Sequence, residues 1–335
     1  MRGRPIFMLA LAVVCLWAIP GPAAPAATQA GGITEFPIPT SGSRPLGITA
    51  GPDGNLWFVE SVGNKVGRIT PTGAITEFPI PTANSAPMEI VTGPDGNLWF
   101  TEYNGNKIGR ITPAGVITEF PIPTANSAPG SIARGPDGRL WFCEDNGNKI
   151  GKMSTSGAVV AEYTIPTAAS SPSGIAVGPD GNLWFTEYNG RKIGRITTAG
   201  VITEFAVPSG GKPLGITLGP DGNLWFTLIL GNRIGRITRT GVITEFGLPT
   251  GSSGPTGITA GPDGHLWFAG NFDNTIGRLN RLGGLKASYQ VPTAGSGPTL
   301  ITVGPDGHLW FTEYDGNQIG RLTMPRSRYL PLALR

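Results

Sequence analysis

A four-residue turn sequence, Gly-Pro-Asp-Gly, recurs seven times in this chain, and this repeat constrains the fold more than any other feature. One residue after each copy the chain reads Leu-Trp-Phe. Units of this length cannot each bury a core of their own, so they pack on their neighbours in a continuous array. The copies lie 41 to 43 residues apart and begin at Gly51, Gly93, Gly135, Gly178, Gly219, Gly261 and Gly304.

Each unit divides into four short segments separated by turn residues. In the second unit these segments span 89–92, 98–102, 107–112 and 116–122. The first turn is Gly-Pro-Asp-Gly, in which Pro presets the backbone, and the second contains Asn104-Gly105, a strong hairpin signal. No segment after the first 30 residues has a sustained apolar period of 3.6, so helices are not expected. Four strands per unit in seven units predict an all-β, seven-bladed β-propeller.

The two ends of the repeat array complement each other. The body opens with an extra strand at 33–38, Ile-Thr-Glu-Phe-Pro-Ile, and the seventh unit stops at Thr323 without its fourth strand. We therefore expect the N-terminal strand to complete the last blade and close the ring, which removes exposed sheet edges.

The first 30 residues have the pattern of an export signal. Arg2 and Arg4 precede an apolar run at 6–19, and Ala24-Pro25-Ala26 is a plausible cleavage site. The apolar run is too short to span a bilayer comfortably. The sequence thus predicts a signal peptide at 1–30, a propeller at 31–323 and a tail at 324–335, in a secreted or extracytoplasmic protein that is not held in a membrane after cleavage.

Charge and cysteine content exclude several classes of protein. The chain has 25 basic and 22 acidic residues, and five of the basic ones lie in the leader or the tail. A near-neutral body argues against nucleic-acid binding, which needs a concentrated basic face. Cleavage of the leader would leave Cys143 as the only cysteine, so no disulfide holds the fold together. We expect a monomer.

The repeat resembles a known family. The segments Ile117 to Thr124 (Ile-Thr-Glu-Phe-Pro-Ile-Pro-Thr), Gly-Pro-Asp-Gly-Asn-Leu-Trp-Phe-Thr-Glu and Asn-Lys-Ile-Gly-Arg-Ile-Thr are similar to the virginiamycin B lyase, or streptogramin B lyase, family over residues 33–323. The resemblance implies a seven-bladed propeller that linearises a cyclic depsipeptide antibiotic by elimination at its ester bond, assisted by magnesium.

Residues that recur in every blade are assigned to architecture. The aspartates of the Gly-Pro-Asp-Gly turns suit turn formation. The basic residue of each third strand, such as Arg68, and the acid of most fourth strands, such as Glu77, predict cross-strand ion pairs.

Departures from the repeat are the candidates for function. On the face formed by the links between second and third strands, five blades carry a glutamate, and blades five and six replace it and its neighbours with apolar or irregular residues. These replacements predict an apolar lip for a ligand or partner. The glutamates are Glu60, Glu102, Glu144, Glu187 and Glu313, and the candidate lip residues are Leu228, Ile229, Asn271 and Phe272.

The central channel supplies the other candidates. Met88 and Glu89 begin the first strand of blade two, where most blades have Gly at the second position, and Arg134 ends the same strand of blade three. A carboxylate near a channel mouth is a candidate for cation binding or an altered pKa, with Arg134 as an alternative partner. Glu89 and Glu102 are the candidate metal ligands, for magnesium by the resemblance alone.

The family's catalytic histidines have no counterparts in this sequence. They lie in segments reading Pro-His-Gly-Ile or Pro-His-Ala-Ile, the last with Glu before Pro, and the matching positions here are Thr256 and Thr299. The two histidines, His265 and His308, lie next to the turns of the other face. Three functions stay open: a propeller that binds a small-molecule or peptide ligand at its central mouth without the lyase chemistry, a magnesium-dependent lyase or other enzyme based on carboxylates, and a module that contacts a protein or glycan.

Overall fold

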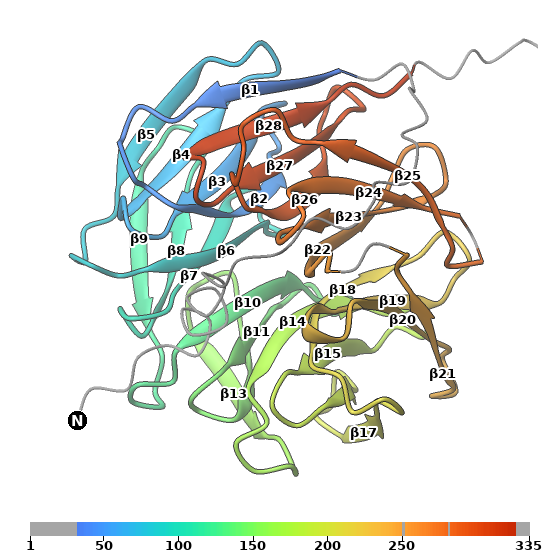
Figure 1. Ribbon diagram of the computed structural model, residues 1–335. Coiled ribbons are helices and arrows are strands. Elements are labelled where there is room, and N and C mark those ends of the chain that lie inside the picture. Colours follow the sequence, from blue (N-terminus) through green and yellow to red (C-terminus); the bar gives the residue numbers. More distant parts are fainter. Residues whose placement is uncertain (1–31, 250–251, 281, 326–335) are drawn as a thin grey trace, which may run out of the picture.

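Seven four-stranded antiparallel sheets form a ring around a central axis (Figure 1). The computed structural model describes residues 32–249, 252–280 and 282–325; the predicted leader and residues 326–335 of the predicted tail lie outside this range. Within it, every regular element is a strand except the short 3₁₀ turn η1 (Ile229–Gly231), and no helix is long and apolar enough to cross a membrane. The all-β, seven-bladed propeller is confirmed.

Each blade has an inner strand at the channel and three further strands outward. The inner strands are β2 (Pro45–Ala50), β6 (Pro87–Thr92), β10 (Pro129–Arg134), β14 (Pro172–Val177), β18 (Pro213–Leu218), β22 (Pro255–Ala260) and β26 (Pro298–Val303). The second strands are β3 (Leu56–Glu60), β7 (Leu98–Glu102), β11 (Leu140–Glu144), β15 (Leu183–Glu187), β19 (Leu224–Leu228), β23 (Leu266–Gly270) and β27 (Leu309–Glu313). The third strands are β4 (Lys65–Ile69), β8 (Lys107–Ile111), β12 (Lys149–Met153), β16 (Lys192–Ile196), β20 (Arg233–Ile237), β24 (Thr275–Leu279) and β28 (Gln318–Leu322). The outer strands are β5 (Ile75–Pro79), β9 (Ile117–Pro121), β13 (Val159–Thr164), β17 (Ile202–Ala206), β21 (Ile243–Gly247), β25 (Leu285–Gln290) and β1 (Ile33–Pro37).

The N-terminal strand closes the ring as the sequence predicts. β1 pairs antiparallel with β28, and the sheet order of the seventh blade is β1-β28-β27-β26 (Figure 1). Phe36 of β1 stacks on Trp310 of β27, with ring centroids 5.5 Å apart. The last blade is therefore built from both ends of the propeller sequence.

The core lies between the blades. The second strand of every blade is buried along its whole length, because neighbouring blades cover both of its faces. Trp57 is fully buried, and its indole Nε1 donates to Asp53 Oδ1 of its own Gly-Pro-Asp-Gly turn at 3.1 Å. The turn aspartate therefore also satisfies a buried donor, a role that recurs in every blade.

The predicted pairing of Arg68 with Glu77 was wrong. Register places Arg68 opposite Thr76 and Glu77 opposite Gly67, so the two side chains point to opposite faces of the sheet. Glu77 instead pairs with Lys65 at 2.9 Å. The Arg68 guanidinium lies over the Trp57 ring, 5.5 Å from its centroid. The same Lys–Glu pairing recurs in blades two, three and four.

Candidate functional site

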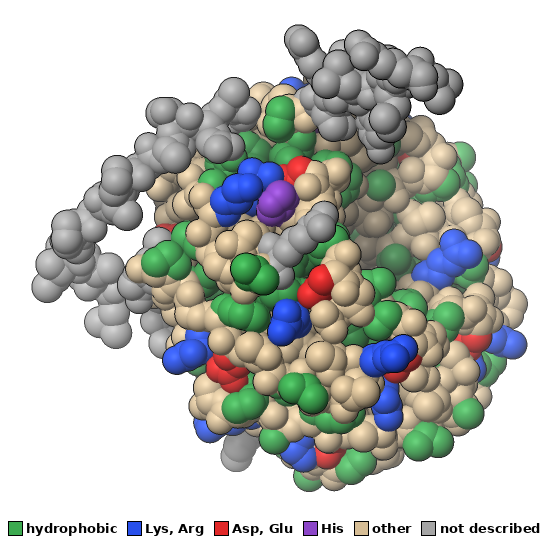
Figure 2. Space-filling view, turned by 90° about the vertical axis from the view of Figure 1, so that its right-hand side faces the viewer, with side chains coloured by type: hydrophobic (Ala, Val, Ile, Leu, Met, Phe, Trp, Pro, Cys, Tyr) green, Lys and Arg blue, Asp and Glu red, His purple; other side chains and the backbone are tan. Residues whose placement is uncertain are grey.

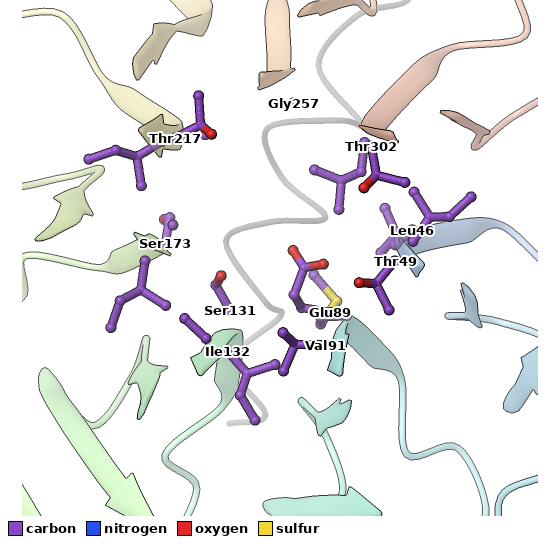
Figure 3. Close-up of a pocket in the computed structure, with 18 of the residues that line it drawn as sticks. Leu46, Thr49, Glu89, Val91, Ser131, Ile132, Ser173, Thr217, Gly257 and Thr302 are labelled. Carbon is purple, nitrogen blue, oxygen red and sulfur yellow. The ribbon is translucent and has the colours of Figure 1, made fainter. Parts of the chain in front are cut away.

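The inner strands of all seven blades converge on a central cavity of about 460 Å³ (Figure 3). Its wall is mainly aliphatic, with hydroxyl groups of Thr and Ser between the apolar side chains. Of the predicted site residues, Met88, Glu89 and Arg134 line it, and so do Thr256 and Thr299. The cavity wall does not include Glu102, Leu228, Ile229, Asn271 or Phe272.

Glu89 extends its carboxylate into the cavity (Figure 3). Its backbone N–H donates to Thr101 Oγ1 at 3.1 Å, and Thr101 Oγ1 donates to Gly130 O at 2.8 Å, which ties β6 to the next inner strand. The carboxylate accepts one long bond, from Ile90 N at 3.4 Å. Because burial disfavours the charged form, the pKa of Glu89 rises to about 8.

Arg134 does not neutralise Glu89. Among the described residues no ion pair links the two side chains; the ion pairs join other residues of the blades. Arg134 is exposed and ends β10, just before the Gly-Pro-Asp-Gly turn of blade three. In that blade Ser131 occupies the position of Glu89, and Arg134 lies three residues beyond Ser131. At roughly 3.3 Å per residue, the two positions are about 10 Å apart along the channel. The alternative ion-pair interpretation was therefore wrong.

Thr256 and Thr299 are buried and both hydroxyls are used for structure. Thr256 Oγ1 donates to Thr299 O at 2.7 Å, and Thr299 Oγ1 donates to Gly297 O at 2.9 Å. A neutral hydroxyl is far too weak a base to abstract a proton in an elimination at neutral pH. These two positions connect blades six and seven at the channel.

The five predicted rim glutamates are buried instead of forming an open carboxylate face. Each is 0% exposed and lies beside the glutamate of an outer strand, and four of the five also lie near a serine. Burial and the neighbouring Glu77 raise the pKa of Glu60 to about 8. Burial and Glu119 do the same for Glu102. Glu102 therefore belongs to a set of neutral buried acids and does not join Glu89 in a shared site.

The predicted apolar lip is mostly interior. Leu228 and Ile229 are 0% and 2% exposed, and Leu228 packs in the cluster between blades four and five. Leu230, in contrast, is 61% exposed. Phe272 lies against the left-handed Gly254, where a Cβ would meet its ring at 2.4 Å, and Asn271 Nδ2 donates to Pro298 O at 3.3 Å. The expectation that Leu228 and Ile229 are accessible was wrong, because the chain turns inward through η1.

Sequence reasoning missed a polar network on the same face. Asp145 is 7% exposed and accepts from Tyr103 Oη at 2.8 Å and from Ser171 Oγ. Burial raises its pKa. The signal was available, since Asp145 occupies the position at which Tyr103 and Tyr188 follow the rim glutamate in other blades.

Comparison with known proteins identifies the family. A sequence profile of the virginiamycin B lyase family matches residues 25–172 and 160–327.

The chain belongs to the virginiamycin B lyase family.

Solved structures of virginiamycin B lyases share the fold and much of the sequence. A streptogramin B lyase structure is 40% identical, with a TM-score of 0.84, over 88% of this chain and 98% of that chain. Selenomethionine-substituted virginiamycin B lyase from Staphylococcus aureus is 41% identical with the same TM-score, over 88% of this chain and 100% of that chain. A catalytically inactive His-to-Ala variant of the staphylococcal enzyme, solved with quinupristin, matches equally well.

The described residues do not fit the magnesium site that the family resemblance implies. Nowhere in the described part of the chain do three His, Cys, Asp or Glu side chains come together. Gly297 stands where the resemblance places a glutamate, and His265 and His308 lie beside the Gly-Pro-Asp-Gly turns, as predicted. His308 Nδ1 accepts from Met324 N at 3.0 Å.

Proposed function

We propose that this member of the virginiamycin B lyase family is an exported protein that binds a small molecule in its central channel and does not use histidine-based elimination chemistry. One observation carries the proposal. The two positions that match the family's catalytic histidines are Thr256 and Thr299, and both hydroxyls donate to backbone carbonyls. Elimination next to a carbonyl needs a base poised near neutral pH, and a hydroxyl does not meet that need.

The cavity supports ligand binding. Its volume of about 460 Å³ lies within the range of small-molecule sites, and its wall combines apolar surface with a few hydroxyls and one carboxylate. Sites of this composition bind through burial of the ligand and select it through the polar groups.

A second function, elimination by a carboxylate base, is favoured by one observation. The pKa of Glu89 is raised to about 8 by burial, which suits proton abstraction near neutral pH. Such an enzyme would use Glu89 in place of histidine.

One experiment separates the two functions. The mature protein is mixed with quinupristin, and binding is measured by calorimetry while ring opening is followed by mass spectrometry, with the staphylococcal lyase as positive control. Binding without ring opening supports the proposal. Ring opening that disappears in Glu89→Gln supports the carboxylate enzyme and overturns the first proposal. Absence of quinupristin binding excludes this antibiotic class as the ligand of the channel.

A further inference from the structure

Glu89 is the one charged residue at its position in the ring. The corresponding residues are glycine in four blades, Gly47, Gly174, Gly215 and Gly257, and Ser131 and Leu300 in the other two. A Cβ at Gly174 would meet Leu214 O at 2.5 Å, so the close approach of neighbouring inner strands normally requires glycine here. A side chain at this position therefore needs room that most blades do not provide.

Gly130, in the neighbouring inner strand, lacks a side chain at a position where the other six blades have one. Met88, Ser173, Leu214 and other residues with side chains occupy its position in the remaining blades. At Gly130 a Cβ would have nothing nearer than Ser173 O at 4.0 Å. Thr101 links Glu89 N to Gly130 O, so Gly130 is the residue of the next inner strand that adjoins Glu89. Two departures from the repeat, in adjacent blades, thus lie next to each other in the channel.

Within the described residues, the Glu89 carboxylate has no ion-pair partner. Among the described lining residues the ionisable side chains are Glu89 and Arg134, and no ion pair joins them. Figure 3 shows Val91 and the hydroxyl of Ser131 near Glu89, and Leu46 and Met88 also line the cavity. A carboxylate in apolar surroundings is stabilised strongly by a cation that brings its own apolar body.

The number of oxygen atoms that could contact a cation in the channel indicates which kind of cation it can bind. Magnesium and calcium need several oxygen ligands, and the described residues gather no group of three acidic or metal-binding side chains. An ammonium ion needs one carboxylate and a few hydroxyl acceptors, which the channel supplies. We propose that the channel binds a small amphiphilic monocation, with its ammonium group on Glu89 and its hydrocarbon part against the aliphatic wall. This inference rests on the proposed ligand binding in the channel and adds the class of ligand.

The test compares a charged and an uncharged probe of the same shape. 2-Phenylethylamine and 2-phenylethanol are titrated into the mature protein, its Glu89→Gln variant and the control Lys286→Gln, which removes an exposed charge of the outer strand β25 away from the cavity. Dissociation constants are measured by calorimetry at pH 8.5, where Glu89, with a pKa of about 8, is mostly ionised. We expect the wild type to bind the amine at least about tenfold more tightly than the alcohol. Glu89→Gln should reduce this preference to less than twofold, and Lys286→Gln should keep it.

The inference is overturned if the wild type shows no preference for the amine, if neither probe binds, or if Glu89→Gln keeps the preference. Should Glu89→Gln fail to fold, Glu89→Ser replaces it, because blade three carries Ser131 at this position. A parallel titration with quinupristin separates this failure from failure of the proposed function. Quinupristin binding without an amine preference overturns the monocation inference alone, whereas absence of binding by all three probes overturns both.

Discussion

Thr256 Oγ1 donates to the backbone carbonyl of Thr299 at 2.7 Å and so joins the inner strands of blades six and seven. In three other blades the corresponding bond comes from the second strand: Thr101, Thr186 and Thr227 donate to Gly130, Leu214 and Thr256. Blade six has Ala269 at that position and lacks the hydroxyl. Thr256 therefore supplies an inter-blade bond that Ala269 cannot make.

This relationship predicts compensation between positions 256 and 269. Thr256→Val should lower the free energy of unfolding by about 1 kcal/mol, because the buried Thr299 carbonyl loses its donor. Adding Ala269→Thr should recover most of that loss, since the new hydroxyl lies where Thr227 lies in blade five. Chemical denaturation of both single variants and the double variant measures the coupling. Additive effects of the two substitutions would show that Thr256 does not replace the missing hydroxyl.

The buried glutamates predict a loss of stability at alkaline pH. The pKa of each, including Glu60 and Glu144, rises from 4.5 to about 8 on folding, so the folded protein binds more protons than the unfolded chain between these values. Their contribution is complete below pH 4.5 and is lost as pH rises through about 8, with a limiting slope of about 1.4 kcal/mol per pH unit for each group. The melting temperature should therefore fall from pH 6 to pH 9.

Glu144→Gln is the matched test of that pH dependence. The amide keeps the shape of the neutral acid and cannot ionise, so the variant should lose less stability than the wild type over the same interval. Folding lowers the pKa values of Asp53 and Glu77, so their contribution to stability is lost only when the pH falls into the acid range. These two groups therefore do not affect stability between pH 6 and pH 9. Parallel melting curves for variant and wild type from pH 6 to 9 would contradict the assignment.

Much of the fold could be predicted because it depends on local, repeated signals. Gly-Pro-Asp-Gly and Asn104-Gly105 mark turns by their own backbone preferences, and strands 89–92, 98–102, 107–112 and 116–122 fall within one or two residues of β6 to β9. Closure of the ring could be predicted because the sequence has one extra strand before the first unit and lacks the fourth strand of the seventh unit. None of these inferences required knowledge of side-chain direction.

The candidate site was harder to predict, because side-chain direction and burial decide it. Arg68 and Lys65 are three residues apart on one strand, and register alone determines which of them meets Glu77. The sequence predicted that Leu228 and Ile229 form an apolar lip, but both side chains are buried where β19 meets η1. Glu89 was identifiable from the sequence because most blades have glycine at its position, where the inner strands pack closely. Figure 2 shows basic side chains spread among acidic ones over one face, a distribution that the sequence does not specify.

The 3₁₀ turn supplies a test of the corrected burial. Ile229→Ser should lower the free energy of unfolding by about 3 kcal/mol, because it removes a buried side chain and leaves a hydroxyl in apolar surroundings. The neighbouring Leu230→Ser is the control and should change stability by less than about 0.5 kcal/mol, since Leu230 is 61% exposed. Denaturant titration distinguishes the two; equal small effects would restore the interpretation of Ile229 as an accessible contact.

The closing blade lacks the lysine that four other blades have. Lys65 Nζ donates to Thr40 Oγ1 at 2.5 Å and to Glu77 at 2.9 Å, and equivalent lysines serve blades two, three and four. In blade seven Glu35 accepts from Thr293 N and Oγ1 as Glu77 does from Thr40, but Gln318 replaces the lysine. Gln318 Oε1 is buried without a hydrogen-bond partner.

Gln318→Lys should therefore stabilise the protein. The ammonium would pair with Glu35 and remove an unsatisfied amide oxygen, for a gain of about 1 kcal/mol that decreases as salt screens the pair. Lys65→Gln in blade one is the reverse control and should cost a similar amount. Denaturant midpoints at low and high salt measure both effects, and amide hydrogen exchange should slow selectively in β1, because the new pair holds the closing strand. If Gln318→Lys adds no stability while Lys65→Gln removes it, blade seven already satisfies its carboxylates by another arrangement.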